Sequence, residues 1–325
     1  MTTRVRDLAR VEVAARMRGV GLPIECGPLL MRLGSRLPEL VDAVSLLYGD
    51  FPIVVEHDGA RAICDFDARV DPAWRWPGSS RFRVRGLIDG RTVFEPFPRR
   101  HALPMFEWAI NWSVFTRPNQ YLMLHAGVVE RGGKALILSG RPGAGKSTLT
   151  AALVLRGWRL LSDEVGVIPP GTRNLLPLPR PVSLKERSID LVRRRSPDAV
   201  IGPLTPGTKK GTVAHLKPPT DSVERAHEPA RAAWLVFPWF GAGYETTLQP
   251  ISRAKALLRA GHEAFNYSML GAVGFETLAD LVDGMACYDL PFSDLNAALE
   301  ALEALPATPP PEPGRALVER VGVDA

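Results

Sequence analysis

Hydrophobic and polar residues alternate over much of residues 51–97, which is the pattern of half-buried β-strands. Turn residues separate the apolar runs, and Asp89-Gly90 is typical of a two-residue hairpin turn. The expected strands are Phe51–Glu56, Arg61–Val70, Arg81–Leu87 and Thr92–Phe97. Helices are expected on either side, over residues 4–18 and Leu103–Thr116. The pattern therefore predicts a smaller α+β N-terminal domain over residues 1–118.

The pattern changes near residue 119, where strands and helices begin to follow one another. Two apolar runs joined by a Gly-Gly turn predict an antiparallel pair, and hence a mixed rather than all-parallel sheet. The expected strands are Tyr121–Val129, Lys134–Ser139, Arg159–Ile168, Val213–Leu216 and Ala233–Phe237. The expected helices are Lys146–Arg156, Leu184–Arg195, Ser252–Ala264, Glu276–Gly284 and Asp294–Leu305. We predict an α/β domain over residues 119–305, followed by a Pro-rich flexible tail over 306–325.

One segment fits the phosphate-binding pattern G-x-x-x-x-G-K-[ST] in full, between an expected strand and an expected helix. Its residues, with Thr148 beside them, are Gly140, Arg141, Pro142, Gly143, Ala144, Gly145, Lys146 and Ser147. Glycines let backbone N–H groups face a phosphate, and the helix N-terminus adds partial positive charge. Lys146 would reach the β- and γ-phosphates, and the Ser147 hydroxyl would bind Mg²⁺. The motif predicts ATP and Mg²⁺ as ligands.

Two adjacent acids, Asp163 and Glu164, follow this motif after only one helix and one strand. Such a short path returns them to the phosphate end of the sheet. Because neighbouring residues on a strand point in opposite directions, one acid could face the metal and the other an acceptor. His125, in the strand before the phosphate-binding loop, could hydrogen-bond Asp163 if the two strands are neighbours. Taken alone, such a histidine is more often a structural residue.

The run from His125 to Glu164 resembles the core of the HPr kinase/phosphorylase family, and more narrowly the HPr-kinase-related subgroup found near peptide-modification genes. The matching pieces are His125-Ala126-Gly127, Gly140–Ser147, Arg156-Gly157 and Leu161-Ser162-Asp163-Glu164. The resemblance implies a P-loop kinase core of the HPr kinase type. It also implies catalytic roles for Asp163, His125 and Lys146, with Asp163 as the base that deprotonates the acceptor hydroxyl. Ser147 and the acid pair would then hold Mg²⁺.

The chain departs from that family at several positions. Thr148 stands where the family usually has Glu, and Glu164 replaces a second Asp. The family's downstream signature is missing, and the nearest feature is Pro179–Lys185. Reverse phosphorolysis and the HPr acceptor are therefore not carried over. The family's hexamers allow a homo-oligomer here, but no residue pattern requires one.

Composition and charge narrow the range of partners. Hydrophobic residues make up 46% and charged residues 23% of the 325 residues, as in ordinary globular proteins. Apolar runs are strand-sized and the three cysteines lie far apart, so we expect a cytoplasmic protein with no membrane segment. The formal charge of the chain is +5, and the basic residues in 185–217 alone exceed the acidic ones by the same number. A charge patch confined to one segment favours a phosphate or an acidic partner over nucleic acid, and an ordinary solvated surface remains an equal alternative.

Several further residues are weaker candidates. Possible phosphate or acceptor contacts are Arg180, Lys185, Lys209 and Lys210. The aromatic run Trp234, Phe237, Trp239 and Phe240 is more typical of a core strand than of a base-stacking platform.

The function that fits best is Mg-ATP-dependent transfer of a phosphoryl group to a Ser or Thr hydroxyl of a peptide or small protein. By elimination, the N-terminal domain would recognise the acceptor or direct assembly. Two alternatives stay open: a small-molecule kinase with the same core, and a nucleotide-binding regulatory or assembly module with slow hydrolysis.

Overall fold

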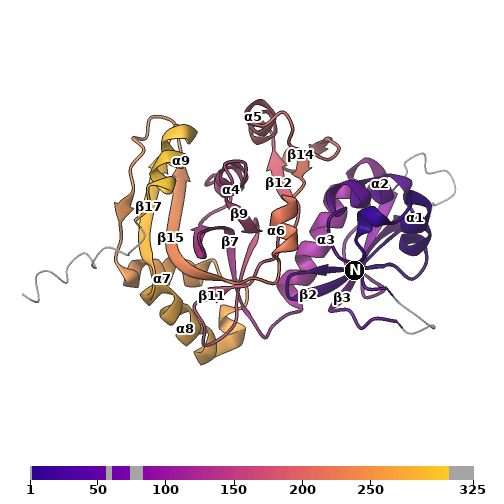
Figure 1. The fold of residues 1–325 in the computed structure, drawn as a ribbon, viewed down its shortest axis with the longest axis horizontal. Coiled ribbons are helices and arrows are strands. Elements are labelled where there is room, and N and C mark those ends of the chain that lie inside the picture. The colour runs from indigo at the N-terminus through magenta and orange to yellow at the C-terminus, as the bar shows by residue number, and fades with distance from the viewer. Residues whose placement is uncertain (1, 56–60, 74–82, 307–325) are drawn as a thin grey trace, which may run out of the picture. The chain divides into compact units, whose positions relative to one another are not determined.

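The computed structural model describes residues 2–55, 61–73 and 83–306. These residues divide into two compact units. Unit 1 takes the described residues of 1–118 and 178–227, and unit 2 takes those of 119–177 and 228–325. The sequence predicted one continuous domain over 119–305, whereas the middle of that range groups with unit 1. Both units are mixed α/β (Figure 1). In the described part of the chain, no helix combines the length and hydropathy needed to cross a membrane.

The N-terminal part of unit 1 builds a sheet in the order β1-β2-β3-β4-β5, with β6 beside β4. Its strands are β1 (Leu22–Cys26), β2 (Leu29–Ser35), β3 (Phe66–Pro72), β4 (Arg83–Ile88), β5 (Arg91–Thr92) and β6 (Phe97–Pro98). Its helices are η1 (Val5–Asp7), α1 (Arg10–Arg18), α2 (Pro38–Leu47), η2 (Arg99–His101) and α3 (Ala102–Thr116). The predicted hairpin turn is confirmed, since Asp89 and Gly90 adopt φ angles of 48° and 76°.

Several predicted strands differ from the observed ones. The strand expected over Phe51–Glu56 is reduced to isolated bridges at Pro52 and Ile53, and Glu56 lies outside the described residues. The strand expected over Arg61–Val70 begins only at Phe66. The run Thr92–Phe97 divides between the two short strands β5 and β6, both paired with β4. The tail predicted over 306–325 also lies outside the described residues, except for Pro306.

Residues 178–227 add a three-stranded sheet, in the order β12-β14-β13, to unit 1. The elements are β12 (Val182–Lys185), α5 (Arg187–Arg195), β13 (Thr205–Thr208), β14 (Gly211–Leu216) and α6 (Thr220–Glu224). Asp50 helps to anchor this segment, because its buried carboxylate binds Lys217 Nζ at 2.8 Å and Thr220 Oγ1 at 2.7 Å. Burial opposes ionisation of Asp50, but hydrogen bonds from these two residues lower its pKa overall. Such long-range contacts explain why the segment groups with unit 1.

Unit 2 contains a mixed sheet of eight strands, with the main order β10-β7-β8-β15-β17-β16, while β9 pairs with β7 and β11 with β15. Its strands are β7 (Leu122–Arg131), β8 (Lys134–Ser139), β9 (Arg159–Ser162), β10 (Val165–Ile168), β11 (Asn174–Leu175), β15 (Ala230–Phe240), β16 (Gln249–Pro250) and β17 (Ala286–Phe292). Its helices are α4 (Lys146–Val154), α7 (Arg253–His262), α8 (Tyr267–Asp283) and α9 (Leu295–Glu303). β7 and β8 are antiparallel, whereas β8, β15 and β17 are parallel neighbours. The predicted mixed sheet is thus confirmed.

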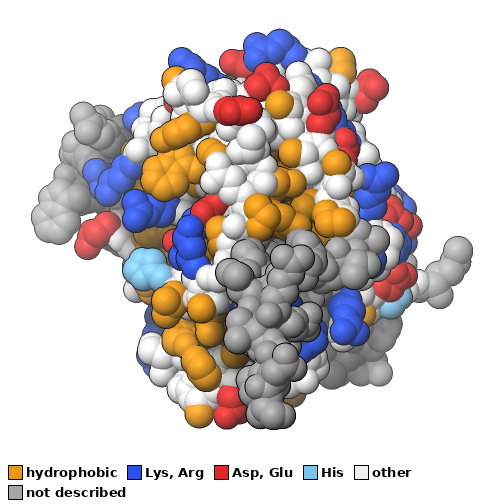
Figure 2. Space-filling model, turned by 90° about the vertical axis from the view of Figure 1, so that its left-hand side faces the viewer, with side chains coloured by type: hydrophobic (Ala, Val, Ile, Leu, Met, Phe, Trp, Pro, Cys, Tyr) orange, Lys and Arg blue, Asp and Glu red, His pale blue; other side chains and the backbone are white. Residues whose placement is uncertain are grey.

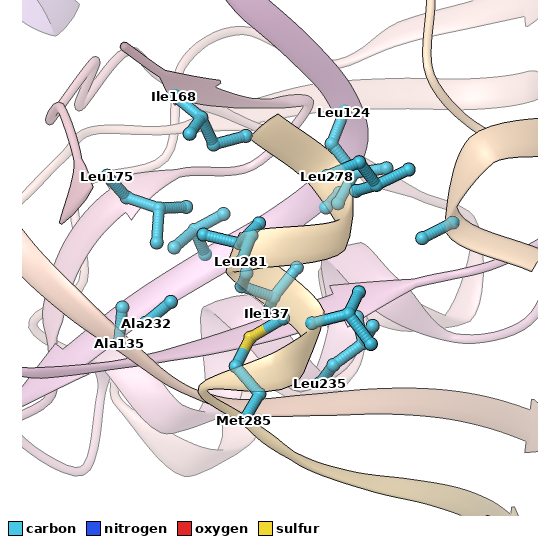
Figure 3. Packing of buried hydrophobic residues seen from close by; sticks show 14 of the residues in the cluster. Leu124, Ala135, Ile137, Ile168, Leu175, Ala232, Leu235, Leu278, Leu281 and Met285 are labelled. Atoms are coloured by element: carbon cyan, nitrogen blue, oxygen red, sulfur yellow. The ribbon is translucent and has the colours of Figure 1, made fainter. Parts of the chain in front are cut away.

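The core of unit 2 forms where α7 and α8 cover one face of the sheet (Figure 1). Alternate residues of β7, including Leu122, Leu124 and Ala126, belong to this core. Figure 3 shows Leu278, Leu281 and Met285 from α8 and the turn after it among side chains of the strands. The other face of β7 contacts α4, the helix that follows residues 140–145. The loop over these residues therefore connects two well-buried elements, β8 and α4.

Candidate active site

The loop that carries the phosphate-binding motif, Gly140–Ser147, lies at the carboxyl end of β8, as its sequence predicted. β8 ends at Ser139, and α4 begins at Lys146. Gly143 and Gly145 have φ angles of 85° and 97°, which are accessible to glycine at little cost. This backbone directs the loop into the N-terminus of a nine-residue helix, where free N–H groups favour an anion.

Lys146 is buried at the start of α4 and bends back over the loop. Its Nζ donates a hydrogen bond to the carbonyl of Gly140 and another, at 3.2 Å, to the carbonyl of Arg141. The ammonium group is therefore held at the concave side of the loop. Ser147 and Thr148 follow on the first turn of the helix and remain half-buried.

The acid pair interrupts a strand rather than ending one. The sequence predicted one strand over Arg159–Ile168, but the structure breaks it into β9 and β10 around Asp163 and Glu164. Both pieces pair with β7, and the ladder keeps its register across the break. The Ser162 hydroxyl accepts a hydrogen bond from the backbone N–H of Val165 at 3.1 Å, which stabilises the interruption.

Pairing with β7 places the acid pair at the same edge of the sheet as the end of β8, where the loop Gly140–Ser147 begins. On one side, Ala126 pairs with Ser139, the last residue of β8. On the other side, the N–H of Ala126 donates to the carbonyl of Glu164 at 3.2 Å. The acids and the loop therefore lie at the same sheet edge, on either side of a single strand.

His125 is placed on the same side of β7 as the P-loop helix. Alternate residues of a strand share a face, and Gly127 approaches Thr150 of α4 so closely that an added methyl group would overlap its hydroxyl oxygen. His125 Nε2 lies 3.7 Å from Glu164 Oε2, and its Nδ1 lies 3.5 Å from Glu263 Oε2. The sequence predicted a bond to Asp163. The ladder resumes with Val165 opposite His125, so Glu164 is the acid beside the ring.

Glu263 is a site residue that sequence reasoning missed. It lies between α7 and α8, and its carbonyl accepts a hydrogen bond from the N–H of His125 at 2.9 Å. Asn266 fixes this loop, because its side chain accepts from Met123 N at 3.0 Å and donates to the carbonyl of Tyr121 at 2.7 Å. In the sequence, Glu263 is marked only as a polar residue shortly before an apolar helix. This pattern could not reveal that its partner is His125, which is distant in sequence.

A cavity of about 970 Å³ opens beside the loop within unit 2. Its walls come from the beginning of the loop, the end of β15 and the exposed side of α7, and they include Gly140–Ala144, Phe237–Phe240, Tyr244, Lys255, Leu258, Arg259, His262, Glu263 and Asp289. The aromatic run of β15 divides here. Trp234 and Phe237 are buried, as predicted for a core strand, whereas Trp239 and Phe240 are 55% and 53% exposed.

The weaker candidates from the sequence lie in unit 1, whereas the P-loop belongs to unit 2. Arg180 is buried, and its guanidinium lies 3.7 Å from Glu107 and donates to Asn111. Lys185 is half-buried at the end of β12. Lys209 and Lys210 are exposed in the two-residue turn between β13 and β14.

The side chains at the sheet edge fit Mg²⁺ by their chemistry. Ser147, Asp163 and Glu164 offer hydroxyl and carboxylate oxygens, the donors that Mg²⁺ prefers. Among the described residues, no group of three or more His, Cys, Asp or Glu has the arrangement of a metal site. Mg²⁺ at phosphoryl-transfer sites is commonly held by one or two side chains together with substrate phosphates and water, so it needs no such cluster.

A scan against protein-family models found no match, and neither did a search of curated proteins, so the likeness to HPr kinases rests on the residues quoted above.

Proposed function

We propose that the protein is a Mg-ATP-dependent phosphotransferase that moves the γ-phosphoryl group of ATP to a Ser or Thr hydroxyl of a peptide or small protein. The observation that carries this proposal is the meeting of the P-loop and the acid pair at one sheet edge, with β7 between them. The loop supplies a phosphate cradle, and the acids supply metal ligands and a base. A phosphate-binding loop alone would not favour transfer over simple binding.

The chemistry follows from these positions. The loop N–H groups and Lys146 hold the β- and γ-phosphates, and Asp163 accepts the proton of the acceptor hydroxyl. The acceptor oxygen forms a bond to the γ-phosphorus, and the bond from that phosphorus to the β,γ-bridging oxygen breaks in line. That oxygen leaves with the electron pair as part of ADP. Ser147 and Glu164 would hold Mg²⁺, which would supply charge neutralisation for the phosphate oxygens.

His125 acts in this proposal as a positioning residue. Its ring lies between the carboxylates of Glu164 and Glu263, and it contacts the ring of Phe265 at a centroid distance of 5.4 Å. This arrangement restricts the orientation of Glu164 at the sheet edge. An oriented metal ligand maintains the geometry that in-line transfer requires.

The acceptor class rests on the resemblance to HPr kinases, and a labelling experiment tests it. Wild-type protein, Asp163→Asn and Asp283→Asn are incubated with γ-labelled ATP, Mg²⁺ and fractionated lysate of the source cells. Asp283 is a suitable control because its exposed side chain pairs with Arg253 at 3.0 Å. We expect wild type and Asp283→Asn, but not Asp163→Asn, to label a peptide or protein, whose modified residue mass spectrometry then identifies.

Other outcomes would favour the alternatives. Label found only in a small molecule would contradict the peptide acceptor and favour a small-molecule kinase. Release of free phosphate alone, with ATP still bound, would contradict transfer and favour a nucleotide-binding regulatory module.

A further inference from the structure

We propose that a cavity in unit 1 binds a peptide segment whose carboxylate side chains are separated by apolar ones. The cavity has a volume of about 840 Å³, and its walls come from α2, β4, the segment from β6 into α3, and residues 203–205. All of these residues belong to unit 1. Among the described residues, none from the P-loop or the acid pair lines it. The inference therefore goes beyond the proposed transfer reaction and does not depend on it.

Two parts of the chain that are distant in sequence build this cavity. One wall consists of η2 and the first residues of α3, and another consists of residues 203–205, where β13 begins. His101 joins the two parts, because its Nε2 lies 3.2 Å from the carbonyl oxygen of Pro206. His101 and Thr205 are both buried. The walls are therefore held together by contacts inside unit 1.

Three guanidinium groups line the cavity against one carboxylate. They belong to Arg83, Arg99 and Arg100, and the carboxylate belongs to Glu39. Arg83 Nη1 donates to the carbonyl of Pro96 at 2.8 Å, but neither Arg83 nor Arg100 forms an ion pair with a described residue. The N-terminus of the 15-residue helix α3 adds partial positive charge at the same wall. The cavity is thus net positive and attracts anionic groups.

The pair of Arg99 and Glu39 shows that this cavity accepts a carboxylate. Arg99 donates from Nε and Nη2 to the two oxygens of Glu39 at 2.6 Å and 2.9 Å, a fork that matches a carboxylate. These hydrogen bonds lower the pKa of Glu39, which keeps it ionised at neutral pH. The two side chains are 44% and 42% exposed, so a carboxylate from another chain can compete with Glu39 for the fork.

The remaining lining is largely apolar and indicates what separates the carboxylates. Leu40 and Leu103 are buried, whereas Leu204 is 45% exposed, and Pro98 and Pro203 lie among them. An exposed leucine beside cations favours a ligand with both apolar and acidic side chains. A single small anion would fill only a minor part of the volume, and a nucleic acid would bring phosphates without apolar side chains.

Many charged side chains elsewhere at the surface have partners of opposite sign nearby. Figure 2 shows a face of the molecule on which acidic and basic side chains are interspersed. In unit 1, Arg10 binds Asp42 at 2.6 Å. Arg83 and Arg100 combine a place in a cavity with the lack of such a partner among the described residues. We therefore expect them to bind carboxylates of a second molecule.

The test uses synthetic peptides as probes and requires no phosphoryl transfer. The acidic probe is a fluorescein-labelled peptide of three Glu-Glu-Leu repeats. In one control peptide Gln replaces every Glu, and in the other Ser replaces every Leu. Dissociation constants with the full-length protein are measured by fluorescence anisotropy at low and high salt.

The variants alter the charges of the cavity one at a time. Arg83→Gln and Arg100→Glu remove cations, and Glu39→Gln removes the internal carboxylate. Arg91→Glu is the matched control for Arg100→Glu, because it changes the net charge equally at an exposed residue of β5 outside the cavity. Like Arg100, Arg91 forms no ion pair with a described residue. Circular dichroism verifies that each variant is folded.

We expect wild type to bind the acidic probe roughly tenfold more tightly than either control peptide, with an affinity that falls as salt rises. Arg83→Gln should weaken binding about threefold through loss of one charge pair. Arg100→Glu should weaken it roughly tenfold, because it also adds repulsion. Glu39→Gln should strengthen binding about twofold or more, because Arg99 loses its internal partner. Arg91→Glu should stay within about twofold of wild type.

Several results would overturn the inference. Equal affinity for the acidic and the Gln-substituted peptides, or binding of no peptide, would show that the cavity does not select carboxylates. Equal losses in Arg100→Glu and Arg91→Glu would mean that only the overall charge matters. Displacement of the probe by equally low concentrations of inorganic phosphate or glutarate would assign the cavity to a small anion. None of these results bears on the proposed transferase, whose failure would in turn leave peptide binding unaffected.

Discussion

Glu107 provides a quantitative prediction for unit 1. This carboxyl is buried on α3, where Tyr48 Oη donates hydrogen bonds to both of its oxygens at 3.0 Å and Arg180 lies 3.7 Å away. Burial raises its pKa from 4.5 to about 7, although Arg180 and the Tyr48 hydrogen bonds oppose the shift. The folded protein therefore binds a proton there that the unfolded chain releases between these two pH values.

The sign and size of the effect follow from linkage. Because the folded pKa is raised, the stabilisation is fully present below about pH 4.5 and is lost as pH rises through about 7. Between pH 5 and pH 8, wild type should lose about 2 to 3 kcal/mol of unfolding free energy through this group. In Glu107→Gln the titration is absent, so that part of the pH dependence should disappear.

Urea unfolding at several pH values between 5 and 8 measures the difference between wild type and Glu107→Gln. Comparing the two proteins cancels the titration of other groups, and the absolute stability of the variant does not enter. Parallel stability curves over this range would refute the reasoning, because they would mean that Glu107 titrates alike in the folded and unfolded states.

Three further predictions concern stability and reactivity. Glu130→Gln should cost about 3 to 5 kcal/mol in chemical denaturation, because it leaves the buried guanidinium of Arg159 without its carboxylate; a loss below about 1 kcal/mol would contradict this. Gly127→Ala should cost about 1 to 3 kcal/mol through overlap with Thr150, and the double variant with Thr150→Ala should recover part of that; no recovery would exclude the overlap as the cause. Burial raises the pKa of the Cys26 thiol to about 12, so iodoacetamide at pH 8 should alkylate this cysteine only after the protein is unfolded. Mass spectrometry detects the alkylation, and rapid labelling of the native protein would contradict the prediction.

Local sequence features predicted the parts of the fold that local physics determines. The turn from β8 into α4 could be predicted because its glycines take up left-handed backbone angles within a short segment. The antiparallel pair of β7 and β8 could be predicted because a Gly-Gly turn joins two apolar runs. The hairpin at Asp89-Gly90 followed from the same turn chemistry.

Features determined by distant contacts escaped the sequence analysis. Strand β2 is buried along almost its entire length, so it lacks the alternation that reveals a half-exposed strand. The break around Asp163 and Glu164 depends on pairing with β7. Glu263 reaches His125 because Asn266 binds the backbone of β7 across 143 residues of sequence.

The central claim is that Asp163 serves transfer rather than nucleotide binding. The most direct test measures, for wild type and Asp163→Asn, both the ATP dissociation constant and the single-turnover rate of transfer to the acceptor identified by labelling. We expect ATP affinity within about threefold of wild type and a transfer rate lower by roughly 10²- to 10⁴-fold, as for loss of a general base. Transfer by Asp163→Asn at the wild-type rate would contradict the account.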